Sequence, residues 1–424
     1  MGSGTTRSSL FSARPAVHQW PALPSNVTVA SCMRPYRAQL TGGLVVITFT
    51  FLCITLYLTP SNDRSLRRFS HVDTHATNAS KRFNKQDGTR SIPSSRNGPL
   101  ETSTCKDTDQ RCAQWRDQGE CISNPAFMLP ACRQACGVCM PAAPITLQVT
   151  LNNGMVMPRI GFGTAGLGEL TSQAVHEALL AGYTLFDTAQ APEWYREDLV
   201  GQAIHNSSIP RSALFLTTKL HPRHHGFNST LRQMQISFAN LHTDYLDLVL
   251  LHYPRCWMEL CGDAKVDGSW QDSWRALEQL VHSGKVHSLG VSNFDLGELS
   301  ELWQMAKVKP AVVQRNSDPL SPDTLVQLYA RLTGMQYQGY STLGSQWLMK
   351  GYDHNPVLAH PAVVKAAATE GRSPAQVVLR WALQHGQAVI PRSSQQDRIR
   401  ANIALDFTLS ADAMQSIDEM AETH

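Results

Sequence analysis

Three polar residues in the middle of the chain each close an apolar run. Asp187 lies at the end of TLFDT, Lys219 at the end of LFLTTK and His252 at the end of DLVLLH. A carboxylate, an ammonium and an imidazole are groups that proteins use to move protons, and a nearby ammonium lowers the pKa of an ionisable hydroxyl by favouring its charged form. Each residue alone is compatible with a helix cap or a solvated rim. Three at successive runs indicate one site.

The elements that must position these residues form a regular alternation from about residue 145 onward. Eight strand-like runs alternate with amphipathic helical patterns over about 270 residues, which predicts an α/β fold with a parallel sheet, closed into a (β/α)8 TIM barrel. In a barrel the three side chains would point into one mouth. The predicted strands are 159–164, 184–188, 214–219, 247–252, 287–293, 311–316, 335–341 and 387–393.

The run from Thr150 to Ala421 resembles the aldo-keto reductases from end to end. The motifs FDTA, TTKL, YLDLVLLHYP, GVSNF and VIPRS stand in the family's order. The resemblance implies an (α/β)8 barrel that uses NADPH or NADH without a Rossmann domain and reduces an aldehyde or ketone to an alcohol. It also implies that Asp187, Lys219 and His252 belong to a catalytic tetrad, in which an imidazole orients the carbonyl oxygen.

The fourth tetrad member departs from the usual pattern. The family places a tyrosine five residues after the aspartate, where this chain has Pro192. The loop is two residues longer than usual, and Tyr195 is its only phenol, as in a variant branch of the family with a lengthened loop. We expect Tyr195 to donate the proton. The alternative is that Tyr195 packs at the rim and the chain is a catalytically impaired NADPH-binding or protein-interaction module.

The resemblance also assigns a cofactor site. Two guanidiniums beside the adenosine 2′-phosphate would favour NADPH over NADH, although the same cluster is compatible with a solvated basic helix start. The implied nicotinamide contacts are Ser292, Asn293, Gln314 and the stacking ring of Tyr340. The other implied cofactor-binding residues are Gly163, Thr164, Asp187, Ser341, Leu343, Gly344, Arg392, Ser393, Arg398 and Asn402.

A second nucleotide motif occurs earlier in the chain. Gly161, Gly163 and Gly166 fit GxGxxG, and Asp187 follows about twenty residues later, as in a dinucleotide fingerprint. The apolar strand that should precede the first glycine is nearly absent, and the resemblance assigns the phosphate contacts near the C-terminus. We therefore favour the barrel over a Rossmann fold.

Six of the ten cysteines lie within residues 105–139. So short a segment cannot bury an adequate core, so covalent links must hold it; zinc is the alternative to disulfides. The segment resembles the ShK-toxin-like domain, which implies the pairs Cys105–Cys139, Cys112–Cys132 and Cys121–Cys136. It lacks the channel-blocking Lys-Tyr pair of the toxins, so we expect a spacer or a contact for a protein partner.

The N-terminal part has three further segments. Residues 1–41 are expected to be a tail without a core, residues 42–59 an uncleaved transmembrane signal anchor, and residues 60–104 a flexible stem. The alternative for 42–59 is a buried helix. Cysteine clustering favours a single-pass type II membrane protein with a lumenal or extracellular barrel, and an organelle transit peptide is the lesser interpretation. Asn78, Asn206 and Asn228 begin glycosylation triplets.

The net charge and two loops of the barrel restrict the classes of function that the sequence allows. The net charge of +3, from 37 basic and 34 acidic residues, argues against nucleic-acid binding. Cys256 and Cys261 would pair only in an oxidising compartment. The loop from His221 to His225 invites a metal, but it has no carboxylate at a fixed spacing, which favours a polar loop without a metal.

Overall fold

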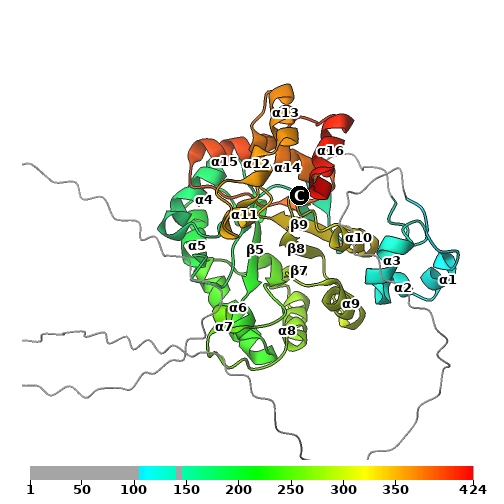
Figure 1. Ribbon diagram of the computed structural model, residues 1–424. Coiled ribbons are helices and arrows are strands. Elements are labelled where there is room, and N and C mark those ends of the chain that lie inside the picture. The colour runs from blue at the N-terminus through cyan, green and yellow to red at the C-terminus, as the bar shows by residue number, and fades with distance from the viewer. Residues whose placement is uncertain (1–104, 140–145, 424) are drawn as a thin grey trace, which may run out of the picture. The chain divides into compact units, whose positions relative to one another are not determined.

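Eight parallel strands form the central sheet of residues 146–423 (Figure 1). The computed structural model describes residues 105–139 and 146–423. Each strand pairs with the next along the chain, and a parallel bridge from Ile160 to Val389 joins the two edges, so the predicted closed barrel is confirmed. The strands are β3 (Gly161–Gly163), β4 (Leu185–Asp187), β5 (Phe215–Leu220), β6 (Leu246–Leu251), β7 (Val286–Ser292), β8 (Val312–Asn316), β9 (Gln336–Tyr340) and β10 (Ala388–Val389).

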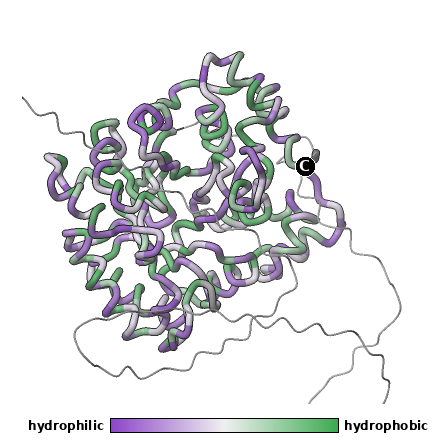
Figure 2. The backbone as a smooth tube through the Cα atoms, turned by 60° about the vertical axis from the view of Figure 1, so that its left-hand side comes forward, coloured by the Kyte–Doolittle hydropathy of each residue, from purple (hydrophilic) through white to green (hydrophobic). Residues whose placement is uncertain are grey.

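Helices connect the strands and surround the sheet. Along the tube of Figure 2 hydrophilic and hydrophobic residues alternate through these helices, as one-sided burial requires. Ser269, Asp295 and Ser373 each begin a helix with a reciprocal capping box, which explains why α8, α9 and α14 start there. The connecting helices are α4 (Thr171–Leu180), α5 (Glu197–His205), α6 (Phe227–Asn240), α8 (Trp270–His282), α9 (Leu296–Met305), α10 (Thr324–Thr333) and α14 (Pro374–Gln384).

Shorter helices decorate the loops and the C-terminus. The longest of these inserted helices precedes α14, and two further helices lie beyond β10 before the short α17. Loop helices are α7 (Met258–Cys261), α11 (Ser345–Met349), α12 (Pro356–Ala359) and α13 (Pro361–Glu370), and the C-terminal helices are α15 (Gln396–Ile403), α16 (Ala411–Asp418) and α17 (Met420–Thr423); 3-10 turns are η2 (Gly168–Leu170), η3 (Arg211–Ala213) and η4 (Pro222–His224).

The amino end of the barrel interior is apolar and closed. Leu185, Phe215, Leu248 and Leu250 pack inside it in one buried cluster. An antiparallel hairpin, β1 (Gln148–Thr150) and β2 (Val156–Pro158), contributes Leu151 and Met157 to that cluster, and Asn152 Nδ2 binds the carbonyl of Pro310 at 2.8 Å. The carboxyl end, where Asp187 and Lys219 lie, is left as the site-bearing face.

The six-cysteine segment folds as three short helices. These are α1 (Cys112–Asp117), α2 (Glu120–Ser123) and α3 (Pro125–Ala131). The disulfides are Cys105–Cys139, Cys112–Cys132 and Cys121–Cys136, which confirms the predicted pairing. Because all six cysteines are disulfide-bonded, none is a thiolate that could bind zinc. With so little chain, the covalent links replace most of a core.

The six-cysteine domain and the barrel belong to one compact unit. Helices α2 and α3 contact α9, and α3 also contacts α10. Ser300 Oγ in α9 donates to the carbonyl of Ile122 at 2.7 Å, and Met128 and Leu129 of α3 are buried in the cluster that contains the barrel's outer core. The domain therefore covers apolar surface of two barrel helices.

The predicted tail, signal anchor and stem lie outside the described residues. Within residues 105–139 and 146–423, no helix combines the length and the hydropathy that crossing a bilayer needs. The GxGxxG motif lies in β3 and the turn after it, where Gly161 and Gly163 are barrel-strand residues. The alternative Rossmann interpretation is therefore wrong.

Candidate active site

Lys219 and Asp187 form a buried ion pair at the carboxyl ends of two paired strands. Lys219 Nζ donates to Asp187 Oδ1 at 2.5 Å and to the carbonyl of Thr188 at 3.0 Å. Both side chains are at most 2% exposed. Because β4 and β5 pair in parallel, with Asp187 opposite Thr217, the lysine two residues further on reaches the carboxylate. Such a pair is held rigidly, since removing either partner leaves a buried charge.

The second carboxylate oxygen of Asp187 links the pair to β8. Gln314 Nε2 donates to Asp187 Oδ2 at 2.9 Å and to Gln338 Oε1 at 2.8 Å. Both amide hydrogens of Gln314 are therefore used inside the barrel. Its Oε1 remains as an acceptor, which suits a carboxamide N–H.

Tyr195 reaches this pair because its loop folds back on itself. The amides of Trp194 and Tyr195 both bind the carbonyl of Ala191, at 2.8 and 2.7 Å. The turn carries the phenol back to the barrel mouth. There Lys219 Nζ lies 4.9 Å from the centroid of the Tyr195 ring, and the His252 ring lies 6.0 Å from it at 72°. The structure thus brings all four predicted catalytic residues together.

Pro192, which occupies the family's usual tyrosine position, is exposed in this turn. Proline lacks the N–H and its φ is fixed near −65°, which suits the second position of a turn. The residue therefore fits a role in shaping the loop that Tyr195 follows.

Burial sets the protonation of Tyr195. It raises the pKa of the phenol well above 10.0, and the carboxylate of Asp187 raises it further. We expected the ammonium of Lys219 to lower this pKa. In the structure Lys219 is neutralised by Asp187, and desolvation dominates. The phenol is therefore protonated at neutral pH, as a proton donor must be.

His252 is neutral in the same environment. Burial lowers its pKa well below 6.5, and the charge of Lys219 acts in the same direction. Its backbone carbonyl accepts from Asn293 Nδ2 at 3.0 Å, which fixes the strand end, while Nδ1 is buried without a hydrogen-bond partner. A neutral imidazole can still donate one hydrogen bond to a carbonyl oxygen.

The predicted nicotinamide contacts line the neighbouring strand ends. Ser292 is buried, and Asn293 adopts a left-handed φ of 62° at the end of β7. The Tyr340 hydroxyl, at the end of β9, donates to Asn293 Oδ1 at 2.8 Å. The network holds the Tyr340 ring by its hydroxyl, and an aromatic ring fixed in this way can stack on a flat ligand.

A glycine turn follows Tyr340. Gly344 has φ 79°, its amide binds the carbonyl of Ser341 at 2.8 Å, and an added Cβ would lie 2.6 Å from Asn355 Oδ1. Asn355 Nδ2 in turn binds the carbonyl of Leu343 at 2.6 Å. Only glycine fits this turn, and the backbone can approach a ligand there.

The predicted phosphate contacts lie after β10. Arg392 and Arg398 are exposed, whereas Ser393 and Asn402 are buried. Among the described residues no carboxylate lies within ion-pair distance of either arginine. The two positive charges are therefore not neutralised by the protein, which fits a phosphate ligand.

Gly163 and Thr164 have structural tasks beside this region. An added Cβ on Gly163 would lie 2.6 Å from the carbonyl oxygen of Ile390, so glycine is required where β3 meets β10. The Thr164 hydroxyl is fully buried and donates to the carbonyl of Asp187 at 2.9 Å. Thr164 thus fixes the backbone of Asp187.

Sequence reasoning missed one polar cluster at the mouth. Glu193 Oε1 lies 3.3 Å from Arg223 Nη2 and 3.5 Å from His221 Nε2. No metal-binding group of three His, Cys, Asp or Glu side chains occurs in the described part of the chain. The sequence does carry a signal for this contact, since an acid lies two residues before Tyr195 and a basic loop follows Lys219.

The loop after His252 is closed covalently. Cys256 and Cys261 form a disulfide, and Trp257 packs edge-on against Tyr253 with ring centroids 5.0 Å apart. We expected these two cysteines to be either disulfide-bonded or reduced, and in the structure they are disulfide-bonded.

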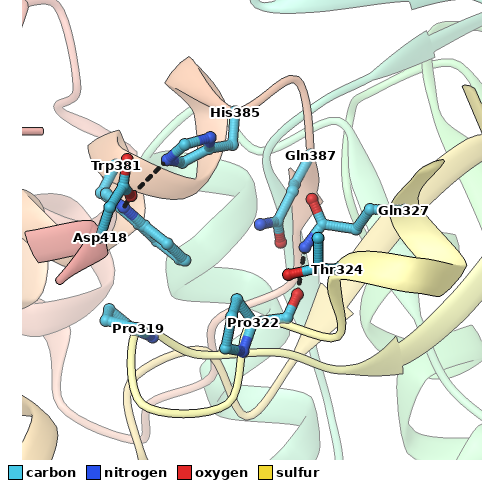
Figure 3. A pocket seen from close by; sticks show the side chains of 8 residues that line it. All are labelled: Pro319, Pro322, Thr324, Gln327, Trp381, His385, Gln387 and Asp418. Atoms are coloured by element: carbon cyan, nitrogen blue, oxygen red, sulfur yellow. Dashed lines mark hydrogen bonds and ion pairs between the residues drawn. The ribbon is translucent and has the colours of Figure 1, made fainter. Parts of the chain in front are cut away.

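A small hollow elsewhere cannot be the substrate site. It is lined by residues that include Pro322, Trp381, His385 and Asp418, with Asp418 accepting from Trp381 and His385 (Figure 3). Its volume of about 10 Å³ suffices for a single water molecule. None of the predicted site residues lines it.

The fold and the site define a (β/α)8-barrel protein with a buried cluster of ionisable side chains at the carboxyl ends of its strands. Residues 159–422 match the model of the aldo/keto reductase family, and residues 104–139 match that of ShK-like domains. The family match covers more than half of the chain. The chain therefore belongs to the aldo/keto reductase family, whose members use nicotinamide cofactors.

Individual relatives agree with this assignment. An aldo-keto reductase of Mycolicibacterium vanbaalenii is 37% identical over 285 residues, which cover 67% of this chain and 95% of the relative. A 9,11-endoperoxide prostaglandin H2 reductase of Trypanosoma cruzi is 35% identical, covering 65% and 91%. The solved structure of a Bombyx mori aldo-keto reductase in complex with NADP is 28% identical with TM-score 0.60, covering 66% and 95%. These names support an oxidoreductase.

Proposed function

We propose that this protein is an NADPH-dependent reductase that converts an aldehyde or ketone to an alcohol. The observation that carries the proposal is the Tyr195 ring, packed 4.9 Å from Lys219 Nζ and 6.0 Å from the His252 ring. Because Pro192 stands where a tyrosine is expected, the chain needs another proton donor. The phenol of Tyr195 is suited to that role. The D-xylose reductase name of a Meyerozyma guilliermondii relative is consistent with carbonyl chemistry, because an aldose carries an aldehyde group.

Each residue has a defined task. A bound reduced nicotinamide supplies the hydride that adds to the carbonyl carbon. Tyr195 donates its hydroxyl proton to the carbonyl oxygen, and the Lys219–Asp187 pair stabilises the phenolate that remains. His252, being neutral, orients the carbonyl oxygen by a hydrogen bond. The buried position of the pair keeps water from competing for these contacts.

The residues present fit an NADPH molecule. Gln314 Oε1, Ser292 and Asn293 would hold the carboxamide, the Tyr340 ring would stack on the nicotinamide, and the turn at Gly344 gives backbone access to the phosphates. Arg392 and Arg398, with no carboxylate partner, would bind the 2′-phosphate, and NADH has no such group.

The test uses the full chain purified in detergent. Absorbance of reduced cofactor would be followed with NADPH and a panel of aldehydes and ketones, for wild type and Tyr195→Phe. We expect turnover that the substitution abolishes. Tyr245→Phe is the matched control, because that hydroxyl binds the carbonyl of Arg211 away from the site. Tight NADPH binding without turnover of any carbonyl would support the alternative, a non-catalytic NADPH-binding or protein-contact module.

We also propose a lumenal or extracellular place for the barrel, as a single-pass type II membrane protein anchored by residues 42–59. Four disulfides support an oxidising compartment. Asn206, which begins a glycosylation triplet, is exposed at the end of α5. Digestion of the cell-expressed protein with a glycan-removing amidase should lower its apparent mass. An unchanged mass together with free thiols would favour a reducing compartment.

A further inference from the structure

We infer that Glu193 is a positioning residue that holds the proton donor Tyr195 over Lys219, by fastening the turn 191–195 to the loop that follows β5. This inference rests on the proposed function, because it assigns Tyr195 the donor role. It adds a residue whose carboxylate contacts neither the Lys219–Asp187 pair nor the Tyr195 ring and that acts through the loop.

The turn needs such a fastening. Its own bonds are two backbone contacts to the carbonyl of Ala191 and one from the amide of Gly166 to the carbonyl of Trp194, at 2.7 Å. Pro192 is exposed and Trp194 is 52% exposed. Among the described residues no hydrogen bond involves the Tyr195 hydroxyl, so the ring has no polar anchor of its own. Its place depends on the backbone that carries it.

Glu193 supplies the side-chain anchor from within this turn. Its Oε1 lies 3.3 Å from Arg223 Nη2 and 3.5 Å from His221 Nε2. Both partners belong to the loop that begins two residues after Lys219. A single carboxylate thus joins the loop that carries the phenol to the loop that follows the strand carrying the ammonium.

The receiving side is rigid. His221 is fully buried, and its Nδ1 accepts from the backbone amide of Arg223 at 3.2 Å, which leaves the hydrogen on Nε2, facing Glu193. Arg223 Nη2 also donates to the carbonyl of Leu260 at 3.1 Å. Leu260 precedes Cys261, which the disulfide ties to Cys256. Arg223 is therefore held between two loops, and Glu193 binds a fixed partner.

The charges favour the contact. Burial lowers the pKa of His221 to about 3, so the imidazole is neutral and Arg223 is the cation that Glu193 neutralises. Because the Arg223 and Glu193 side chains are 32% and 37% exposed, water screens the charge of this pair. The acceptor oxygen of Glu193 is therefore what anchors the turn.

The experiment compares Glu193→Ala and Glu193→Gln with wild type in the full chain. We expect Glu193→Ala to lower kcat for the aldehyde about ten- to a hundredfold, the effect of a small displacement of a catalytic group. The KM for NADPH and the melting temperature should stay unchanged, because neither depends on the phenol. Glu193→Gln should recover most of kcat, since its amide oxygen can still accept from Arg223 Nη2, as Glu193 Oε1 does.

Hydrogen exchange gives a second readout that needs no turnover. The amides of Trp194 and Tyr195 should exchange faster in Glu193→Ala than in wild type. Glu419→Ala, which removes an exposed acid bonded to Gln415 in the C-terminal helical region, is the control for both readouts. Wild-type kcat and wild-type exchange in Glu193→Ala would overturn the inference, as would equal losses in the Ala and Gln variants. If wild type turned over no aldehyde, the proposed function would be wrong. Hydrogen exchange at Trp194 and Tyr195 would still show whether Glu193 holds the turn.

Discussion

At the residue scale, the site is organised around one buried charge pair. Lys219 and Asp187 neutralise one another, so the strongest influence left on Tyr195 and His252 is desolvation. It moves the two pKa values in opposite directions, upward for the phenol and downward for the imidazole. Both groups are consequently neutral over the physiological range, and each retains a hydrogen to donate.

These directions predict the pH dependence of carbonyl reduction. Tyr195 must be protonated to act as an acid, and its pKa lies well above 10.0, while that of His252 lies well below 6.5. We expect kcat/KM to be level between these two values, because neither group changes charge there. A pH–rate profile with NADPH in excess checks this, with substrate stability controlled at each pH. An alkaline loss of kcat/KM near neutrality would contradict the assigned acid.

The arginines after β10 give a second prediction at this scale. Arg392→Ala and Arg398→Ala should each weaken NADPH binding about ten- to a hundredfold, since a hydrogen bond to a charged group is worth roughly 1.5–3 kcal/mol. NADH binding should hardly change, because it lacks the 2′-phosphate. Fluorescence titration of both cofactors measures this. Arg400 is an exposed arginine of the helix that carries Arg398, and Arg400→Ala should leave both affinities as in wild type.

At the scale of elements, a buried carboxyl joins the helix after Tyr195 to the strand that carries Lys219. Glu197 Oε1, at the start of α5, accepts from Thr218 in β5 at 2.5 Å and from Ser237 in α6 at 2.9 Å. Three elements therefore meet at one side chain. The start of α5 is fixed against Thr218, the residue next to Lys219. This contact complements that of Glu193 on the other side of Tyr195.

Glu197 predicts a pH-dependent stability. Burial raises its pKa above 4.5, so its contribution to the free energy of unfolding is greatest below 4.5 and is lost as pH rises through the higher folded pKa. Glu197→Gln should remove that part of the pH dependence. Glu197→Ala should cost about 1–3 kcal/mol, because buried hydroxyls lose their acceptor.

Urea unfolding of the three proteins at a series of pH values measures the effect. Asp412, an exposed acid of the C-terminal helical region, provides the control substitution to alanine. The interpretation is wrong if Glu197→Gln retains the full pH dependence of the wild type.

How far the sequence predicts this site depends on the residue. Asp187, Lys219 and His252 follow from strand periodicity, because a parallel barrel brings strand ends together whatever the loops do. Tyr195 and Glu193 lie in a loop whose path depends on backbone contacts with distant segments, such as Gly166 to Trp194. Periodicity carries no information about such contacts. The bonds of Gln314 inside the barrel were hidden for the same reason.

At the scale of the whole molecule, the six-cysteine domain is packed on the barrel. Its buried Leu129 and Met128 belong to the same apolar cluster as α9 and α10 residues such as Leu299 and Tyr329. Those two helices flank β8, which carries Gln314. A domain that we predicted as a spacer or a contact for a partner therefore also covers barrel surface. The sequence predicted its disulfides but gave no sign of this contact.

This packing predicts cooperative unfolding. Leu129→Ala should lower the stability of the domain and the barrel together by about 2–5 kcal/mol, the usual effect of deleting a buried leucine side chain. Calorimetry should show one transition that shifts as a whole. Phe127→Ala, at a neighbouring position that is 47% exposed, should cost less. Two separate transitions, with the barrel's unchanged, would show that the domain unfolds independently.

The Cys105–Cys139 disulfide has a mechanical consequence. It joins the two ends of the six-cysteine domain, 34 residues apart in sequence, with their Cα atoms 5.6 Å apart. A pulling force applied to the chain before residue 105 passes through the sulfur bridge to residue 139 and bypasses α1, α2 and α3. Under tension the six-cysteine domain would not extend. The contour length of the chain between Cys105 and Cys139 would become available only after the disulfide is reduced.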